Sequence, residues 1–132
     1  MRGGIFFLAI VPDEPVQEEV TRFKKEAAAR FNSMHALRSP PHITLFPPFK
    51  WPGSRVLELE EALMQFASGE VPFELTLKNF DCFRPRVIFV DVEKNGSLFK
   101  LQQQLSAHLA DAIELESKDN RPYHPHMTIA FK

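Results

Sequence analysis

Hydrophobic residues along this chain follow two different periods, and the first part of the chain shows both. Residues 5–11 are almost continuously apolar, which predicts a buried strand. Apolar residues then recur every three or four positions, which predicts an amphipathic helix over residues 15–32 with Asp13 as its cap. This stripe consists of Val16, Val20, Phe23, Ala27 and Phe31. We expect the polar residues between them, Lys24 and Lys25 included, to face the solvent.

The same two periods recur through the rest of the chain. A second apolar run predicts a strand over residues 42–46, and we expect Pro47-Pro48 to end it. A second helix is predicted to begin at a cap on Ser54 and to end at Gly69. The remaining predicted elements are a half-exposed strand over 73–78, a strand over 87–92, a helix over 97–113 and a strand over 126–131.

The order of these elements indicates a duplication. A strand, a helix and a second strand follow one another in residues 5–49, and the same order recurs in residues 87–132. The spacing between the elements is nearly equal in the two units. We therefore expect an α+β fold with two related lobes, mainly antiparallel sheets, outer helices and a central groove between the lobes.

The second unit is shorter than the first. In the first unit the last strand is followed by a helix and another strand, whereas the second unit ends at Lys132. This difference predicts that a C-terminal helix and strand are missing, or that a partner chain completes the second lobe. The alternative is a natural short form of the protein.

Each unit contains the same histidine tripeptide on its last strand, His42-Ile43-Thr44 and His126-Met127-Thr128. Because residues two apart on a strand share a face, each histidine should lie beside its threonine, with Ile43 and Met127 turned into the core. Two imidazoles and two hydroxyls that face one cleft are suited to acid–base chemistry on a phosphate ester.

These residues also have simpler explanations. Each histidine can be a core residue bonded to the backbone, and threonine is common in ordinary strands. His124 can join His42 and His126 in a three-histidine metal site, although we favour a place for it at the entrance of the site. The aromatic stretch 46–51 can stack on a nucleobase, but such a segment is more often a packed turn.

Composition narrows the class of protein. The chain has 132 residues, is 44% hydrophobic and carries a formal net charge of −1. This balance favours a short or small phosphorylated substrate over a long duplex. The lone Cys82 favours a reducing, cytoplasmic setting without disulfides, and no apolar run approaches the length of a membrane span.

The segments 41–45 and 124–130 resemble the motifs of the 2H phosphoesterases, a superfamily that includes 2′-5′ RNA ligase-like proteins and 2′,3′-cyclic phosphodiesterases. The resemblance extends over essentially the whole chain and implies that His42 and His126 act as acid and base without a metal or other cofactor. It implies that Thr44 and Thr128 bind the phosphate of a 2′,3′-cyclic or 2′-5′-linked ribonucleotide end. Relatives often carry a basic residue soon after the second motif, whereas here only Phe131 and Lys132 follow, as in a C-terminally truncated member.

Two other classes of function remain open from the sequence. One is a nucleotide- or RNA-end-binding module that has the groove but little catalytic activity. The other is a regulatory lobe that assembles with another chain.

Overall fold

The computed structural model describes residues 2–131 of the chain. Contacts divide this part into two compact units, and each unit is assembled from three separate segments. The first unit contains residues 2–8, 45–75 and 95–123, and the second contains residues 9–44, 76–94 and 124–131. The two predicted motif units are each shared between these compact units, and their boundaries as lobes stay a prediction.

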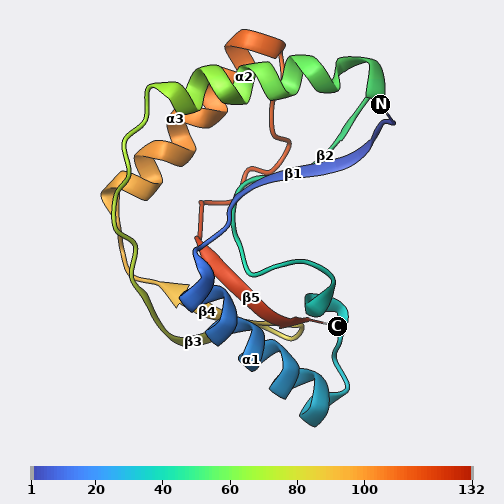
Figure 1. The fold of residues 1–132 in the computed structure, drawn as a ribbon, viewed down its shortest axis with the longest axis vertical. Helices are drawn as coiled ribbons and strands as arrows, with labels where there is room; N and C mark the ends of the chain where they lie inside the picture. Colours follow the sequence, from blue (N-terminus) through green and yellow to red (C-terminus); the bar gives the residue numbers. More distant parts are fainter. Residues whose placement is uncertain (1, 132) are drawn as a thin grey trace. The chain divides into compact units, whose positions relative to one another are not determined.

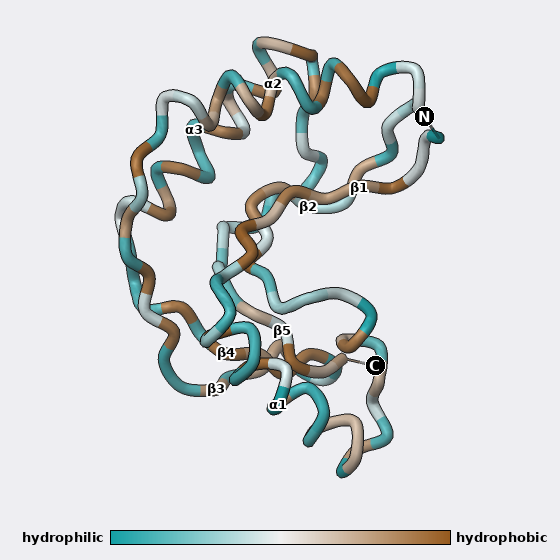
Figure 2. The backbone as a smooth tube through the Cα atoms, in the orientation of Figure 1, coloured by the Kyte–Doolittle hydropathy of each residue, from teal (hydrophilic) through white to brown (hydrophobic). Residues whose placement is uncertain are grey.

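The first unit contains most of a two-stranded sheet formed by β1 (Gly4–Ile10) and β2 (Ile43–Trp51). The prediction that Pro47 and Pro48 end the second strand is wrong, because β2 continues through both. A two-stranded sheet has open edges, where a proline without an N–H group does not break a ladder hydrogen bond. Figure 2 shows hydrophobic residues along β1.

Two helices complete the first unit. Helix α2 (Val56–Ser68) follows a short 3₁₀ helix, η2 (Gly53–Arg55), and packs beside α3 (Gly96–Ile113), as Figure 1 shows. The prediction that Ser54 caps α2 is wrong, because Ser54 lies inside η2 and Arg55 occupies the cap position. Each helix has a buried face, with Leu59 and Ala62 on α2 and Leu105 and Leu109 on α3.

The second unit is built on an antiparallel sheet with the order β3-β4-β5. Its strands are β3 (Leu77–Phe83), β4 (Val87–Val92) and β5 (His126–Phe131). Helix α1 (Glu14–Phe31) packs against β5 (Figure 1), and the Phe23 ring meets Phe80 of β3 edge-on at 5.1 Å. The α+β fold with antiparallel strands that the sequence predicts is therefore confirmed.

The half-exposed strand expected over residues 73–78 is displaced along the chain. Strand β3 begins only at Leu77 and runs to Phe83, where a short turn connects it to β4. The ladder is irregular between Leu77 and Phe80, and Asn79 there has a φ of 66°. Pairing with β4 rather than local alternation determines where β3 lies.

Lys24 also departs from the sequence pattern. We expected it on the outside of α1, but it is 2% exposed and its Nζ donates hydrogen bonds to Ala36 O at 2.7 Å and Ser39 O at 2.8 Å. Its spacing explains this position, because Lys24 lies four residues after Val20 and three before Ala27, which are both buried. Both acceptors lie in or directly after a second 3₁₀ helix, η1 (His35–Arg38).

Candidate active site

His42 and Thr44 lie where the chain enters β2. Ile43 and Leu45 are buried, as predicted, while His42 and Thr44 are both half-buried. The Nδ1 atom of His42 lies 2.8 Å from the carbonyl oxygen of Pro40, two residues earlier. A carbonyl oxygen only accepts hydrogen bonds, so this contact places a proton on Nδ1 of the neutral ring.

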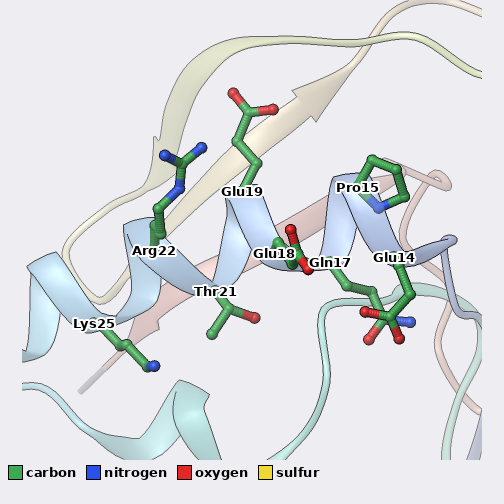
Figure 3. Close-up of a pocket in the computed structure, with 8 residues that line it drawn as sticks. All are labelled: Glu14, Pro15, Gln17, Glu18, Glu19, Thr21, Arg22 and Lys25. Atoms are coloured by element: carbon green, nitrogen blue, oxygen red, sulfur yellow. The ribbon is translucent and has the colours of Figure 1, made fainter.

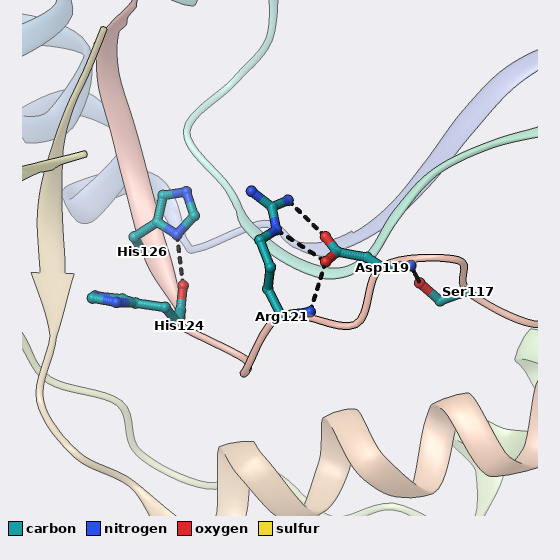
Figure 4. Close-up of polar contacts among 5 residues, drawn as sticks. All are labelled: Ser117, Asp119, Arg121, His124 and His126. Carbon is teal, nitrogen blue, oxygen red and sulfur yellow. Dashed lines mark hydrogen bonds and ion pairs between the residues drawn. The ribbon is translucent and has the colours of Figure 1, made fainter. Parts of the chain in front are cut away.

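His126 and Thr128 repeat this arrangement at the start of β5. Met127 and Ile129 are buried, while His126 and Thr128 are half-buried. The Nδ1 atom of His126 lies 2.7 Å from the carbonyl oxygen of His124, again two residues earlier (Figure 4). Both histidine rings are therefore held by the same type of backbone contact, which is a feature that the sequence motif alone does not reveal.

All four predicted site residues belong to the second unit. The two histidines are close enough for a positive charge on His42 to lower the pKa of His126. The largest cause is burial, which lowers the pKa of His126 because it disfavours the charged ring. Charge on His124 also lowers it, while the hydrogen bond to His124 O and the carboxylate of Asp91 act in the opposite direction.

Two phenylalanines from neighbouring strands form a wall beside His126. The Phe83 ring lies 4.9 Å and the Phe89 ring 5.1 Å from the His126 ring, and the two phenylalanine rings are 4.4 Å apart. Phe89 is fully buried, and Phe83 is 37% exposed. These two rings contribute to the burial that disfavours a charge on His126.

This wall could not be predicted from the sequence, because it depends on pairing between strands. In the β4–β5 ladder, Asp91 is opposite His126 and Phe89 is opposite Thr128, so these four side chains share one face of the sheet. The apolar run of β4 predicts that Phe89 is buried, but it does not predict that Phe89 lies beside His126.

His124 has an exposed ring, and its expected place at the entrance of the site stays a prediction. Its Nε2 lies 3.5 Å from Asp91 Oδ1, and its ring meets Phe83 edge-on at 5.0 Å. Its backbone carbonyl has the more direct effect, because it fixes the ring of His126. Within residues 2–131, no three His, Cys, Asp or Glu side chains are grouped so that they could hold a metal ion.

The aromatic stretch 46–51 packs on itself. Phe46 and Trp51 are 1% and 6% exposed, and Phe49 meets both rings edge-on at 5.4 and 6.0 Å. This segment therefore forms part of the first unit's core, but as the second half of strand β2 rather than as the expected packed turn.

Two other polar features lie outside the four predicted residues. In the first unit, the guanidinium of Arg121 bonds both carboxylate oxygens of Asp119 (Figure 4), which lowers the pKa of Asp119 to about 2. In the second unit, a hollow runs along the surface of α1 (Figure 3). It is lined by Glu14, Pro15, Gln17, Glu18, Glu19, Thr21, Arg22 and Lys25. The hollow contains no site histidine.

Residues 12–132 match the family model of the 2′-5′ RNA ligase superfamily. The chain belongs to this superfamily. A Bacillus pumilus protein named "Putative phosphoesterase" is 29% identical over the whole of this chain and 71% of its own length. A Bacillus subtilis protein named "RNA 2′,3′-cyclic phosphodiesterase" is 34% identical over 69% of this chain and 51% of its own length.

The fold is also found in a solved structure. The crystal structure of TT0787 of Thermus thermophilus superimposes with a TM-score of 0.72 over 97% of this chain and 73% of that chain, at 21% identity. The family predicted from the two histidine motifs is thus confirmed, and with it a 2H-type enzyme at the level of the family. Within the described residues, 2–131, no helix is long and apolar enough to cross a membrane.

Proposed function

We propose that this chain is a metal-independent phosphoesterase that opens 2′,3′-cyclic phosphates or cleaves 2′-5′-linked ribonucleotide ends by acid–base catalysis. The observation that carries the proposal is the matched pair of histidines, each with Nδ1 bonded to the carbonyl two residues earlier. In both rings this leaves Nε2 to exchange protons with the substrate. Membership of the superfamily and the relatives named as phosphodiesterases support the same substrate class.

His126 is the base in this proposal. Burial and the nearby charge on His42 both lower the pKa of His126, so the neutral ring is favoured when His42 carries the proton. The Nε2 of neutral His126 then accepts a proton from water as the water oxygen attacks phosphorus.

His42 is the acid. Its Nδ1–H remains bonded to Pro40 O, and its Nε2–H donates the proton to the ribose oxygen as the phosphorus–oxygen bond breaks. The products are a phosphate monoester and a free ribose hydroxyl, and the pair returns to its starting state when the proton on His126 passes to solvent and His42 regains one. If a ribose hydroxyl attacks phosphorus in place of water, the same two proton transfers would form a 2′-5′ linkage.

Thr44 and Thr128 are the proposed phosphate ligands. Each lies two residues after its histidine, Thr128 on the same face of β5 as His126 and Thr44 in β2, which begins directly after His42. A hydroxyl there can donate a hydrogen bond to a phosphoryl oxygen, and this bond becomes stronger as negative charge develops in the transition state.

The test is hydrolysis of a 2′,3′-cyclic nucleotide by the purified protein, with and without an excess of chelator. We expect His42→Ala and His126→Ala each to lose about 10²- to 10⁴-fold in kcat, while the chelator has no effect. His35→Ala is the matched control, because His35 is exposed, lies in the same unit and stacks on Phe131 rather than in the site. Full activity in His126→Ala, or loss of activity with chelator, would refute the proposal, and binding without product would support the binding-module alternative.

A further inference from the structure

Lys24 has an unusual environment for a lysine. It is 2% exposed, and its two hydrogen-bond acceptors, Ala36 O and Ser39 O, are backbone carbonyls rather than carboxylates. Lysine is rarely buried to this extent unless its amino group is fully engaged. Burial lowers the pKa of Lys24, so this position carries a cost that a leucine or methionine would avoid.

The acceptors of Lys24 lie in the segment that leads directly to His42. Ala36 is inside η1, and Ser39 is the residue that follows η1. The carbonyls at the end of a helical turn have no partner within the turn, and the Lys24 amino group satisfies two of them. Pro40 comes next, and its carbonyl is the group that holds Nδ1 of His42.

Other contacts fix the rest of this segment, but they act further from His42. Ser33 Oγ donates a hydrogen bond to Phe131 O at 2.8 Å, and the His35 ring stacks on the Phe131 ring at 5.6 Å. These contacts tie the beginning of the segment to the end of β5. Lys24 ties its end, one residue before the carbonyl that orients the catalytic ring.

We propose that Lys24 is a positioning residue for His42. By fixing the carbonyls of Ala36 and Ser39, its amino group places the Pro40 carbonyl so that the proton of neutral His42 sits on Nδ1 and Nε2 faces the substrate. The catalytic consequence rests on the proposed function, but the effect on the His42 ring does not. His126 provides an internal comparison, because its supporting carbonyl belongs to His124, outside the segment that Lys24 holds.

The experiment compares Lys24→Met with Lys25→Met. Methionine has nearly the length of lysine but cannot donate a hydrogen bond, and Lys25 is the exposed neighbour on the same helix. Two-dimensional ¹H–¹⁵N NMR of the imidazole nitrogens reports which nitrogen of each neutral ring carries the proton. Hydrolysis of a 2′,3′-cyclic nucleotide gives kcat and KM, and thermal unfolding shows whether each variant is folded.

In Lys24→Met we expect His42 to lose its preference for the Nδ1–H tautomer, while His126 keeps it. We expect kcat to fall by about 10- to 100-fold, as for a misplaced catalytic group, with a much smaller change in KM. Lys25→Met should match the unchanged protein in every measurement. If Lys24→Met does not fold, Lys24→Gln, which retains a shorter donor, is measured in the same way and should show the same selective effect on His42.

Three results would overturn the proposal. One is a variant with a lower melting temperature but an unchanged His42 tautomer, which is the outcome of a purely structural role. The second is an equal change in both histidines, which indicates general loosening of the unit. The third is loss of activity with both tautomers retained. If the unchanged protein has no activity, the proposed function fails, and the tautomer of His42 in Lys24→Met still decides whether Lys24 positions this ring.

Discussion

Removal of the Phe83 ring should both destabilise the second unit and raise the pKa of His126. Phe83 and Phe89 form the apolar wall beside the His126 ring, and burial is the largest cause of its lowered pKa. Phe83→Ala opens the side of this wall that faces solvent and allows water to reach the ring. Hydration favours the charged form, so the pKa should move up toward the ordinary value of 6.5.

The cost in stability follows from the exposed fraction of each phenylalanine. A fully buried Phe→Ala substitution costs about 3–5 kcal/mol in the free energy of unfolding, which is the expectation for Phe89 at 0% exposure. Phe83 is 37% exposed, so about two-thirds of that loss, or about 2–3 kcal/mol, is expected. Phe80, at 58% exposed, should cost about 1–2 kcal/mol.

Phe80 is the matched control for the effect on His126. It lies on the same strand as Phe83 but three residues earlier, and it packs against Phe23 of α1 rather than against the histidines. Urea denaturation measures the stability of each variant, and NMR titration of the ring protons measures the pKa of His126. The reasoning would be refuted if Phe83→Ala lost stability without raising this pKa, or if Phe80→Ala raised it equally.

Two further predictions concern pH and helix capping. Burial lowers the pKa of His126 in the folded chain below the ordinary value of 6.5. At pH values between the lowered pKa and 6.5, the unfolded chain binds a proton at His126 that the folded chain does not. The free energy of unfolding should therefore fall as the pH drops through this window, and His126→Gln should remove that part of the pH dependence in urea denaturation; an identical dependence in both proteins would contradict the assigned shift. Asn95 accepts a hydrogen bond from Leu98 N at 3.0 Å and donates one to Glu74 O at 2.9 Å, so Asn95→Ala should cost about 1–2 kcal/mol. Asp13→Ala at the start of α1 should cost only a few tenths of a kcal/mol, because Asp13 makes no capping bond through its side chain; equal losses in the two variants would count against this account.

Most helices and strands could be predicted from the sequence because their burial has a regular period. Helices α1 and α3 and strands β4 and β5 lie within a residue or two of the predicted ranges. The buried positions between the site residues, such as Ile43 and Met127, follow from simple alternation. In these elements local pattern and tertiary packing agree.

The departures occur where a partner distant in sequence determines the structure. Lys24 has the spacing of a core position, but its polar side chain hides this until the two carbonyls that accept its hydrogen bonds are known. Strand β3 is placed by its pairing with β4, and β2 continues through Pro47 and Pro48 because it lies in a two-stranded sheet.

The site shows the same division. The two motifs could be identified from the sequence, because each repeats a titratable and a hydroxyl side chain two residues apart, and the roles of these four residues stay a prediction. The carbonyls that hold the two rings and the phenylalanine wall could not, since they depend on backbone geometry and on register between strands. The carbonyls place a proton on Nδ1 of each neutral ring, and burial lowers the pKa of His126; the motif alone leaves both open.

The dependence of kcat/KM on pH for hydrolysis of a 2′,3′-cyclic nucleotide tests the central claim most directly. A base that must be neutral and an acid that must be charged give a bell-shaped profile. Because His126 is the proposed base and its pKa is lowered, the acidic limb should fall below pH 6.5. Phe83→Ala should move this limb to higher pH. A profile that is flat between about pH 5 and 9 would contradict catalysis by two imidazoles.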